Sequence, residues 1–185
     1  MSDTGQRVCP VENAGHLESR MRRWLQNPQK LIGPYLKEGM TVLDVGCGPG
    51  FFSIEMARMV GASGRVIAAD LQDGMLQKLR DKIQGTELEA RVVLHQCGKQ
   101  SIGWTEPVDF VLAFYMLHEL PDQDAFFREI EALLTPDGHV FIIEPPFHVS
   151  KAAFAETLKK SQNAGLTPVA APRVFLSKST LLKKG

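Results

Sequence analysis

Val42-Leu-Asp-Val-Gly-Cys-Gly-Pro-Gly50-Phe-Phe is the stretch that decides how this chain folds. A short apolar run containing Asp44 ends in three glycines at alternate positions, Gly46, Gly48 and Gly50, and a helical pattern follows at once. This arrangement is typical of a strand that ends in a loop whose backbone passes close to a ligand, because glycine has no Cβ to block the approach. The sequence therefore predicts a ligand site directly after this strand.

The spacing of the glycines separates two kinds of ligand. A dinucleotide-binding loop follows G-x-G-x-x-G, in which the third glycine lets the helix pack on the strand and the pyrophosphate lies at the helix N-terminus. Here Phe51 occupies the place of that third glycine, and Asp44 would repel a pyrophosphate. The pattern favours a ligand that carries positive charge. An NAD(P)-dependent oxidoreductase of Rossmann type is the alternative.

Composition sets the broad class of the protein. The 185 residues, 44% of them hydrophobic and 23% charged, indicate one soluble domain over residues 1–185. Because 21 basic residues balance 21 acidic ones, we expect no nucleic-acid partner. The polar N-terminus and the lack of a long apolar run predict no membrane partner and a cytoplasmic location.

The cysteines are odd in number and widely spaced. Cys9, Cys47 and Cys97 therefore do not form a disulfide framework, which fits a reducing compartment. Three isolated thiols are the simpler interpretation, and a three-thiolate site for a soft metal is the alternative.

Apolar runs alternate with helical patterns along the chain, which is typical of an α/β protein with a parallel sheet. The predicted strands are Thr41–Val45, Arg65–Ala69, Arg91–Gln96, Phe110–Phe114 and His139–Glu144. The predicted helices are Phe51–Val60, Gly74–Gln84, Asp122–Leu134 and Lys151–Ala164, with Asp137-Gly138 as the turn before the fifth strand. Two last segments, Thr167–Ala171 and Arg173–Leu182, predict a closing hairpin around Pro172.

An amphipathic helix is predicted near the N-terminus, where Leu17, Met21, Trp24 and Leu25 recur at helical spacing. It would pack on the sheet, cover the ligand site, or do both. We assign residues 1–36 to a helical lid on the substrate side.

Asp70 is the predicted partner of the glycine loop. It follows the second predicted strand, roughly twenty residues beyond the loop, where a carboxylate accepts both hydroxyls of a ribose. Capping of the next helix is the alternative role.

Three blocks now resemble a known family, the class I S-adenosylmethionine-dependent methyltransferases, and within it the methyltransferase type 11 and quinone-biosynthesis-methyltransferase-like group. The blocks are Asp44-Val-Gly-Cys-Gly-Pro-Gly50, Asp70 after Val-Ile-Ala-Ala, and Leu133-Leu-Thr-Pro-Asp-Gly138. The resemblance implies a three-layer, Rossmann-like α/β fold whose seven-stranded, mostly parallel sheet has the order 3-2-1-4-5-7-6 and an antiparallel last strand. It implies S-adenosyl-L-methionine as cofactor, S-adenosyl-L-homocysteine as product, and a small-molecule methyl acceptor. A non-catalytic S-adenosylmethionine-binding protein is a further alternative.

The resemblance also implies roles for individual residues. The three glycines would border the methionyl and ribose parts, Asp44 would lie near the methionyl amino group, and Asp70 would hold the ribose. The other expected cofactor-binding residues are Cys47, Phe51, Leu71, Gln72, Met75, Gly98, Lys99, Phe114 and Met116. Gly98 stands where many relatives have an aspartate for the adenine amino group, so a backbone carbonyl, Gln100 or water would replace it.

The methyl acceptor is expected over the ends of the fourth and fifth strands. A base is needed there only if the acceptor carries a proton. His118 is the first candidate because histidine titrates near neutral pH, and Glu144 is the second. Tyr115 and Glu119 complete the predicted catalytic set. In the alternative, His118 only closes the pocket or orders its loop.

No metal site is expected at these strand ends. His118-Glu119-Leu-Pro is not H-E-x-x-H, and Pro121 would break the helix that such a motif needs. The segment after the fifth strand is too short to roof an acceptor pocket. We therefore expect the N-terminal segment, or a second subunit of a homodimer, to cover it.

Overall fold

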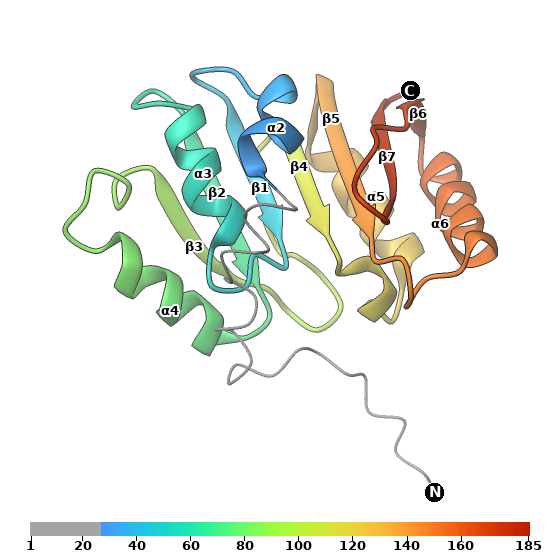
Figure 1. Cartoon of the computed structure of the whole chain (residues 1–185), viewed down its shortest axis with the longest axis horizontal. Helices are drawn as coiled ribbons and strands as arrows, with labels where there is room; N and C mark the ends of the chain where they lie inside the picture. The colour runs from blue at the N-terminus through green and yellow to red at the C-terminus, as the bar shows by residue number, and fades with distance from the viewer. Residues whose placement is uncertain (1–26) are drawn as a thin grey trace, which may run out of the picture.

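The computed structural model describes residues 27–185 (Figure 1). The predicted amphipathic helix with Leu17 and Trp24 lies outside these residues. The described part of the N-terminal segment forms a short helix, α2 (Pro28–Ile32), and a 3-10 turn, η2 (Gly33–Tyr35). Ile32 is buried there, and the Tyr35 ring packs edge-on against Phe141 at 5.4 Å between centroids. These contacts hold residues 28–35 on the sheet.

A seven-stranded sheet of order β3-β2-β1-β4-β5-β7-β6 forms the middle layer. The strands are β1 (Thr41–Val45), β2 (Arg65–Asp70), β3 (Val92–Gln96), β4 (Val108–Phe114), β5 (Leu134–Glu144), β6 (Leu166–Ala170) and β7 (Lys178–Lys184). Strand β7 runs antiparallel to both neighbours, and the other pairs are parallel. The predicted order and the antiparallel last strand are confirmed.

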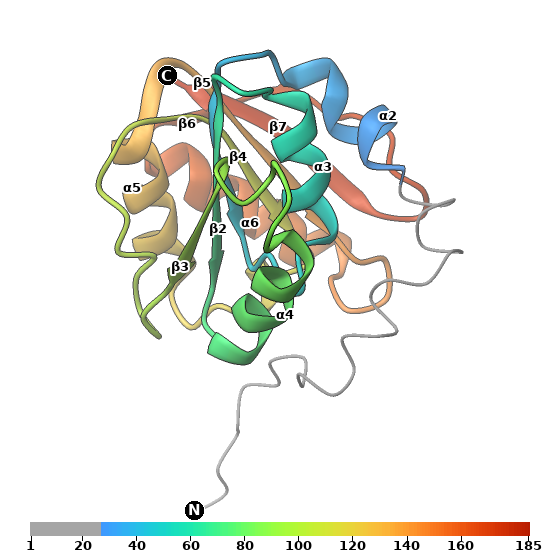
Figure 2. The same cartoon turned by 90° about the vertical axis from the view of Figure 1, so that its left-hand side faces the viewer.

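Helices cover both faces of the sheet (Figure 2). The helices α3 (Phe51–Met59) and α4 (Asp73–Ile83) lie with α2 on one face, and α5 (Gln123–Leu133) and α6 (Lys151–Asn163) lie on the other. Two buried clusters, one on each face, make up the core. The central strands are buried on both sides, which explains their continuous apolar runs.

Two predicted strand starts, those of β5 and β7, differ most from the structure. The Asp137-Gly138 pair lies within β5, where four residues, 135–138, bulge opposite Asp109. The Asp109 carboxylate holds this bulge, because it accepts hydrogen bonds from Thr41 N at 2.9 Å and Thr135 Oγ1 at 3.2 Å. Strand β7 starts at Lys178 rather than Arg173.

The shorter β7 has a local cause. Ser177 N donates to Val174 O at 3.0 Å and closes a turn, and Leu176 has a φ of +53°. A left-handed residue within a closed turn cannot continue a strand. Residues 171–177 therefore form a loop that joins β6 to β7.

The loops that line the site lie at the carboxyl ends of β1 to β4. In a sheet wound from both sides, this edge binds the ligand. Within the described residues, the connection from β3 to β4 is a loop without a helix, which leaves the edge open beside Cys97 and Gln100. No helix in residues 27–185 is long and apolar enough to cross a membrane.

Candidate active site

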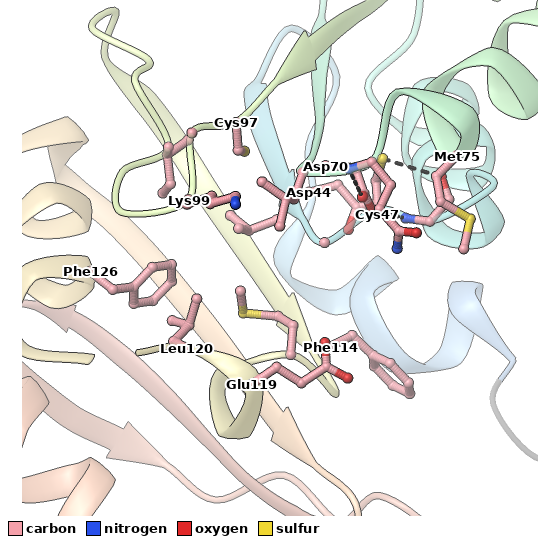
Figure 3. Close-up of a pocket in the computed structure, with 18 of the residues that line it drawn as sticks. Asp44, Cys47, Asp70, Met75, Cys97, Lys99, Phe114, Glu119, Leu120 and Phe126 are labelled. Carbon is pink, nitrogen blue, oxygen red and sulfur yellow. Dashed lines mark hydrogen bonds between the residues drawn. The ribbon is translucent and has the colours of Figure 1, made fainter. Parts of the chain in front are cut away.

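A cavity of about 920 Å³ opens at the carboxyl ends of β1 to β4. This volume lies at the upper end of the range of about 300–1,000 Å³ seen for small-molecule sites. In Figure 3, Asp44, Asp70 and Cys47 lie on one side of it, and Leu120 and Phe126 lie on the opposite side. The predicted cofactor residues that line it are Asp44, Gly46, Cys47, Gly48, Phe51, Asp70, Leu71, Gln72, Met75, Gly98, Lys99, Phe114 and Met116.

The glycine loop serves the cavity and the packing of the helices in different ways. At Gly48, with a φ of +54°, an added Cβ would meet no atom within 4 Å, so the backbone faces open space. At Gly50, with a φ of +87°, an added Cβ would lie 2.3 Å from Leu79 Cδ1. Gly50 does not line the cavity. A glycine is needed at position 50 because the start of α3 packs closely against Leu79 of α4.

Asp70 ties the first two loops together. Its Oδ2 accepts a hydrogen bond from Gly48 N at 2.9 Å, and its Oδ1 accepts one from Gln72 N at 2.8 Å. Burial raises the pKa of this carboxyl, and the hydrogen bonds from Gln72 and Gly48 oppose the rise. The predicted ribose ligand is therefore also the residue that orients the glycine loop.

Asp44 is buried near the carboxyl end of β1, a central strand, and it accepts a hydrogen bond from Ser53 Oγ at 2.5 Å. Ser53 is itself fully buried in the first turn of α3. It was missed from the sequence. The available signal was a single small polar residue on the apolar side of a helix that starts at a ligand loop.

Cys47 and Cys97 both line the cavity. Burial raises the pKa of the Cys47 thiol well above its usual range, and it raises that of Cys97 to about 12. Such thiols stay protonated at neutral pH and make poor metal ligands. Among residues 27–185, no cluster of three or more His, Cys, Asp or Glu side chains could hold a metal ion. Cys9 lies outside the described residues.

The four predicted catalytic residues fall into two groups. Tyr115 and Glu119 line the cavity, whereas His118 and Glu144 do not. Glu144 is 1% exposed, and its carboxylate binds His118 Nδ1 at 2.8 Å and accepts a hydrogen bond from Leu117 N at 3.1 Å. The hydrogen bond that His118 Nδ1 makes to the Glu144 carboxylate raises the pKa of His118. The pair orders the turn η3 (Leu117–Glu119) behind the cavity wall.

Glu119 and Tyr115 line the cavity, and their polar groups have different surroundings. Burial raises the pKa of Glu119, and nearby His118 opposes the rise. Tyr115 has a φ of +57°, and its hydroxyl lies 2.6 Å from Ser177 Oγ in the loop between β6 and β7. Tyr115 therefore joins the cavity wall to a segment more than sixty residues further along the chain.

Carboxylates dominate the charge of the cavity. Besides Asp44, Asp70 and Glu119, Asp122 and Glu129 line it, and Lys99 is the one Lys or Arg among the described lining residues. Asp122 caps α5, and Glu129 accepts hydrogen bonds from the backbone N–H groups of residues 102 and 103 at 2.9 and 2.7 Å. Glu129, which fixes the loop after β3, was not predicted from the sequence. The overall sign suits a cationic or neutral ligand.

An aromatic wall lies next to the carboxylates. The rings of Phe51, Phe52, Phe114 and Tyr115 form a chain in which successive centroids are 5.0, 4.6 and 4.1 Å apart. All four residues line the cavity. This part of the site offers flat apolar surface.

Comparison with known proteins identifies the family. Residues 36–177 match the family model described as a methyltransferase domain, so the chain belongs to this family. It is 36% identical over 110 residues to a demethylmenaquinone methyltransferase of Lactobacillus johnsonii, covering 59% of this chain and 45% of that protein. Over the same share of this chain and 44% of the relative, it is 30% identical to a ubiquinone/menaquinone biosynthesis C-methyltransferase of Cellvibrio japonicus. The aligned part is thus less than half of each relative's length.

Solved structures show the same fold over nearly the whole chain. A SAM-dependent methyltransferase from Aquifex aeolicus superposes with a TM-score of 0.83 at 27% identity, covering 95% of this chain and 97% of that one. A TehB-like SAM-dependent methyltransferase from Corynebacterium glutamicum has a TM-score of 0.72 at 18% identity, covering 95% and 100%, and shows the likeness of fold alone.

Proposed function

We propose that the chain transfers a methyl group from S-adenosylmethionine to a small-molecule acceptor. The observation that carries this proposal is the hydrogen bond from Gly48 N to Asp70 Oδ2, which joins the glycine loop and the carboxylate after β2 into one wall of the cavity. Asp44 lines the same wall.

The residues of the cavity fit this cofactor. It carries a sulfonium and an ammonium charge and no phosphate, which agrees with a wall rich in carboxylates and with Phe51 at the start of α3. In this proposal Asp44 holds the amino group, Asp70 holds the ribose hydroxyls, and Leu71 and Met75 contact the adenine side. The open space at Gly48 leaves room for the ligand against the backbone. When bound, the cofactor supplies an electrophilic methyl group.

We assign the contact with the acceptor to Tyr115 and Glu119, and a positioning role to Glu144 and His118. Methyl transfer is an in-line displacement, so holding the acceptor in line supplies much of the rate. Where the acceptor carries a proton, Glu119 is the carboxylate at the cavity wall that accepts it. Its raised pKa brings it closer to neutral pH, as a general base requires.

A flat aromatic acceptor is the first class to test. The chain of rings from Phe51 to Tyr115 offers it stacking contacts. The relatives in Lactobacillus johnsonii and Cellvibrio japonicus are named for quinones, which are flat cyclic compounds that can stack on aromatic rings. The protein can be incubated with S-adenosylmethionine and either a soluble hydroquinone or an aliphatic amine of similar size. If the acceptor is flat and aromatic, more S-adenosylhomocysteine should form with the hydroquinone.

Calorimetric titration tests the cofactor. We expect S-adenosylmethionine and S-adenosylhomocysteine to bind, and NAD⁺ and NADP⁺ not to bind. Asp70→Asn should lower the affinity for the cofactor about 10- to 100-fold, because hydrogen bonds to a charged group contribute roughly 1.5–3 kcal/mol. The matched control is Asp81→Asn on the exposed side of α4. Binding of NAD⁺ in place of S-adenosylmethionine would contradict the proposal, and tight binding without product from any acceptor would favour a non-catalytic role.

A further inference from the structure

Three large apolar side chains stand out from the surface near the cavity. Phe147 is 89% exposed, Phe175 is 61% exposed and Leu176 is 62% exposed. They belong to two loops, residues 145–150 after β5 and residues 171–177 before β7. Figures 1 and 2 show both loops on the same side of the molecule.

The two loops adjoin the same end of the paired strands β5 and β7. Lys178 Nζ donates a hydrogen bond to Pro146 O at 3.3 Å, and Glu144 and Lys178 are paired across β5 and β7. Because the loops adjoin paired strand ends, we group Phe147, Phe175 and Leu176 and call them the apolar patch. Monomeric proteins expose single apolar residues often, but a group of them marks an interaction site.

The loop of residues 171–177 holds Phe175 and Leu176 outward. Val174 is buried, and its carbonyl accepts the hydrogen bond from Ser177 N that closes the turn around Phe175 and Leu176. Ser179 Oγ donates to Pro172 O at the base of the loop. The exposure of Phe175 and Leu176 thus follows from an anchored loop tip. Ser177 also contacts Tyr115, so the patch lies beside the cavity wall.

The part of the chain that carries the patch is rich in basic residues, although the whole chain is neutral. Between Pro145 and Gly185 the sequence has one acidic residue, Glu156. The same stretch contains the cations Lys151, Lys159, Lys160, Arg173, Lys178, Lys183 and Lys184. Of these, Lys151, Arg173 and Lys178 lie in or next to the two loops.

We propose that the apolar patch docks on the surface of an anionic lipid membrane. Apolar tips that enter the interface, flanked by cations that meet lipid headgroups, are the two features of such binding. A second copy of the chain would place like charges face to face. An acidic peptide would need a groove, and these side chains protrude. Composition predicted no membrane partner because no run can span a bilayer, but surface docking needs no span. The proposal does not depend on methyl transfer.

Vesicle sedimentation tests the proposal. The full-length protein should sediment with vesicles of equal parts phosphatidylglycerol and phosphatidylcholine, and not with phosphatidylcholine alone. The combined Phe147→Ser, Phe175→Ser and Leu176→Ser variant should lose on the order of a hundredfold in binding, since each side chain contributes apolar area. Arg173→Glu should cost about fivefold or more, and added salt should weaken binding further.

Matched controls lie on the same half of the chain. Val169→Ser changes an apolar side chain that is 44% exposed on β6, and Lys159→Glu changes an exposed cation on α6; both should bind vesicles nearly as the unchanged protein does. The triple variant should keep its melting temperature and its affinity for S-adenosylhomocysteine. Failure of the unchanged protein to bind anionic vesicles, or equal binding by the triple variant, would overturn the proposal. A lowered melting temperature would show instead that another part of this chain covers the patch, and loss of a dimer would show that a second copy does.

Discussion

The two walls of the cavity are built in different ways. The wall after β1 and β2 is held by backbone N–H groups, because Asp70 binds Gly48 N and Gln72 N. The wall after β4 is held by side chains, in the pair of His118 with Glu144 and the pair of Tyr115 with Ser177. Contacts held by the backbone change little when side chains are substituted, which suits a cofactor common to all reactions. Contacts held by side chains change with a substitution, which suits a site that selects the acceptor. We therefore place cofactor binding on the first wall and acceptor choice on the second.

The largest expected effect is on the packing of α3 against α4, behind the first wall. Gly50→Ala would put a methyl 2.3 Å from Leu79 Cδ1 at a φ of +87°. We expect a loss of about 3 kcal/mol in the free energy of unfolding, from overpacking and the left-handed conformation together. Urea unfolding measures it. Gly85→Ala is the control, because its φ is +72° but no atom lies within 4 Å of the added carbon, so it should cost only about 1 kcal/mol. Equal losses in the two variants would contradict the packing argument.

Ser53→Ala should have the next largest effect. It removes the hydroxyl that donates to the buried Asp44 carboxylate, and leaving such a group without this donor costs about 1–3 kcal/mol. Thermal unfolding and S-adenosylhomocysteine titration should both show the loss. Ser161→Ala removes another buried hydroxyl, bonded to Leu158 O on α6, and should leave cofactor affinity unchanged. If both variants lowered the affinity for the cofactor equally, the hydrogen bond from Ser53 to Asp44 would have no specific role in cofactor binding.

A smaller effect is expected on the second wall. Tyr115→Phe removes the hydroxyl that contacts Ser177 and should cost about 1 kcal/mol or less in stability, since this is one neutral hydrogen bond. Its effect should appear in KM for the acceptor, with cofactor affinity retained. Tyr35→Phe is the matched control, because Tyr35 packs against the sheet away from the cavity. Weaker cofactor binding in Tyr115→Phe would contradict the assignment of cofactor binding to the first wall alone.

The smallest expected effect is in the pH dependence of stability. Glu144 raises the pKa of His118 above its ordinary value of about 6.5, so the folded state binds the proton more tightly than the unfolded state. This contribution is complete below pH about 6.5 and is lost as the pH rises through the raised pKa. Glu144→Gln should lower the His118 pKa, seen in an NMR titration of the ring, and flatten stability over that range. An unchanged His118 pKa would exclude Glu144 as its cause.

The first wall was largely predictable from the sequence. Glycine spacing, Asp44 and Asp70 are local signals, and the loops that carry them follow directly from buried strands. Thirteen of the fourteen predicted cofactor residues line the cavity, and Gly50 instead serves the packing of α3 on α4. Ser53 and Glu129 were missed because nothing in the sequence near either residue indicates the distant group that it bonds, the Asp44 carboxylate for Ser53 and the backbone of residues 102 and 103 for Glu129.

The second wall was predicted less well. His118 and Glu144 were correctly placed at the ends of β4 and β5, but their side chains bind each other behind the cavity. The start of β7 was also wrong, because the turn closed by Val174 and Ser177 ends the loop later than the apolar pattern indicates.

By itself, the sequence determined the sheet order through the resemblance to its family, and the glycine loop through local spacing, because these depend on residues close together in the chain. The tertiary structure decided which side chains face the cavity, how Tyr115 meets Ser177, and that Phe147, Phe175 and Leu176 are exposed. These features arise from contacts between distant segments. Their geometry is set by the packing of β5 against β7, which no local pattern specifies.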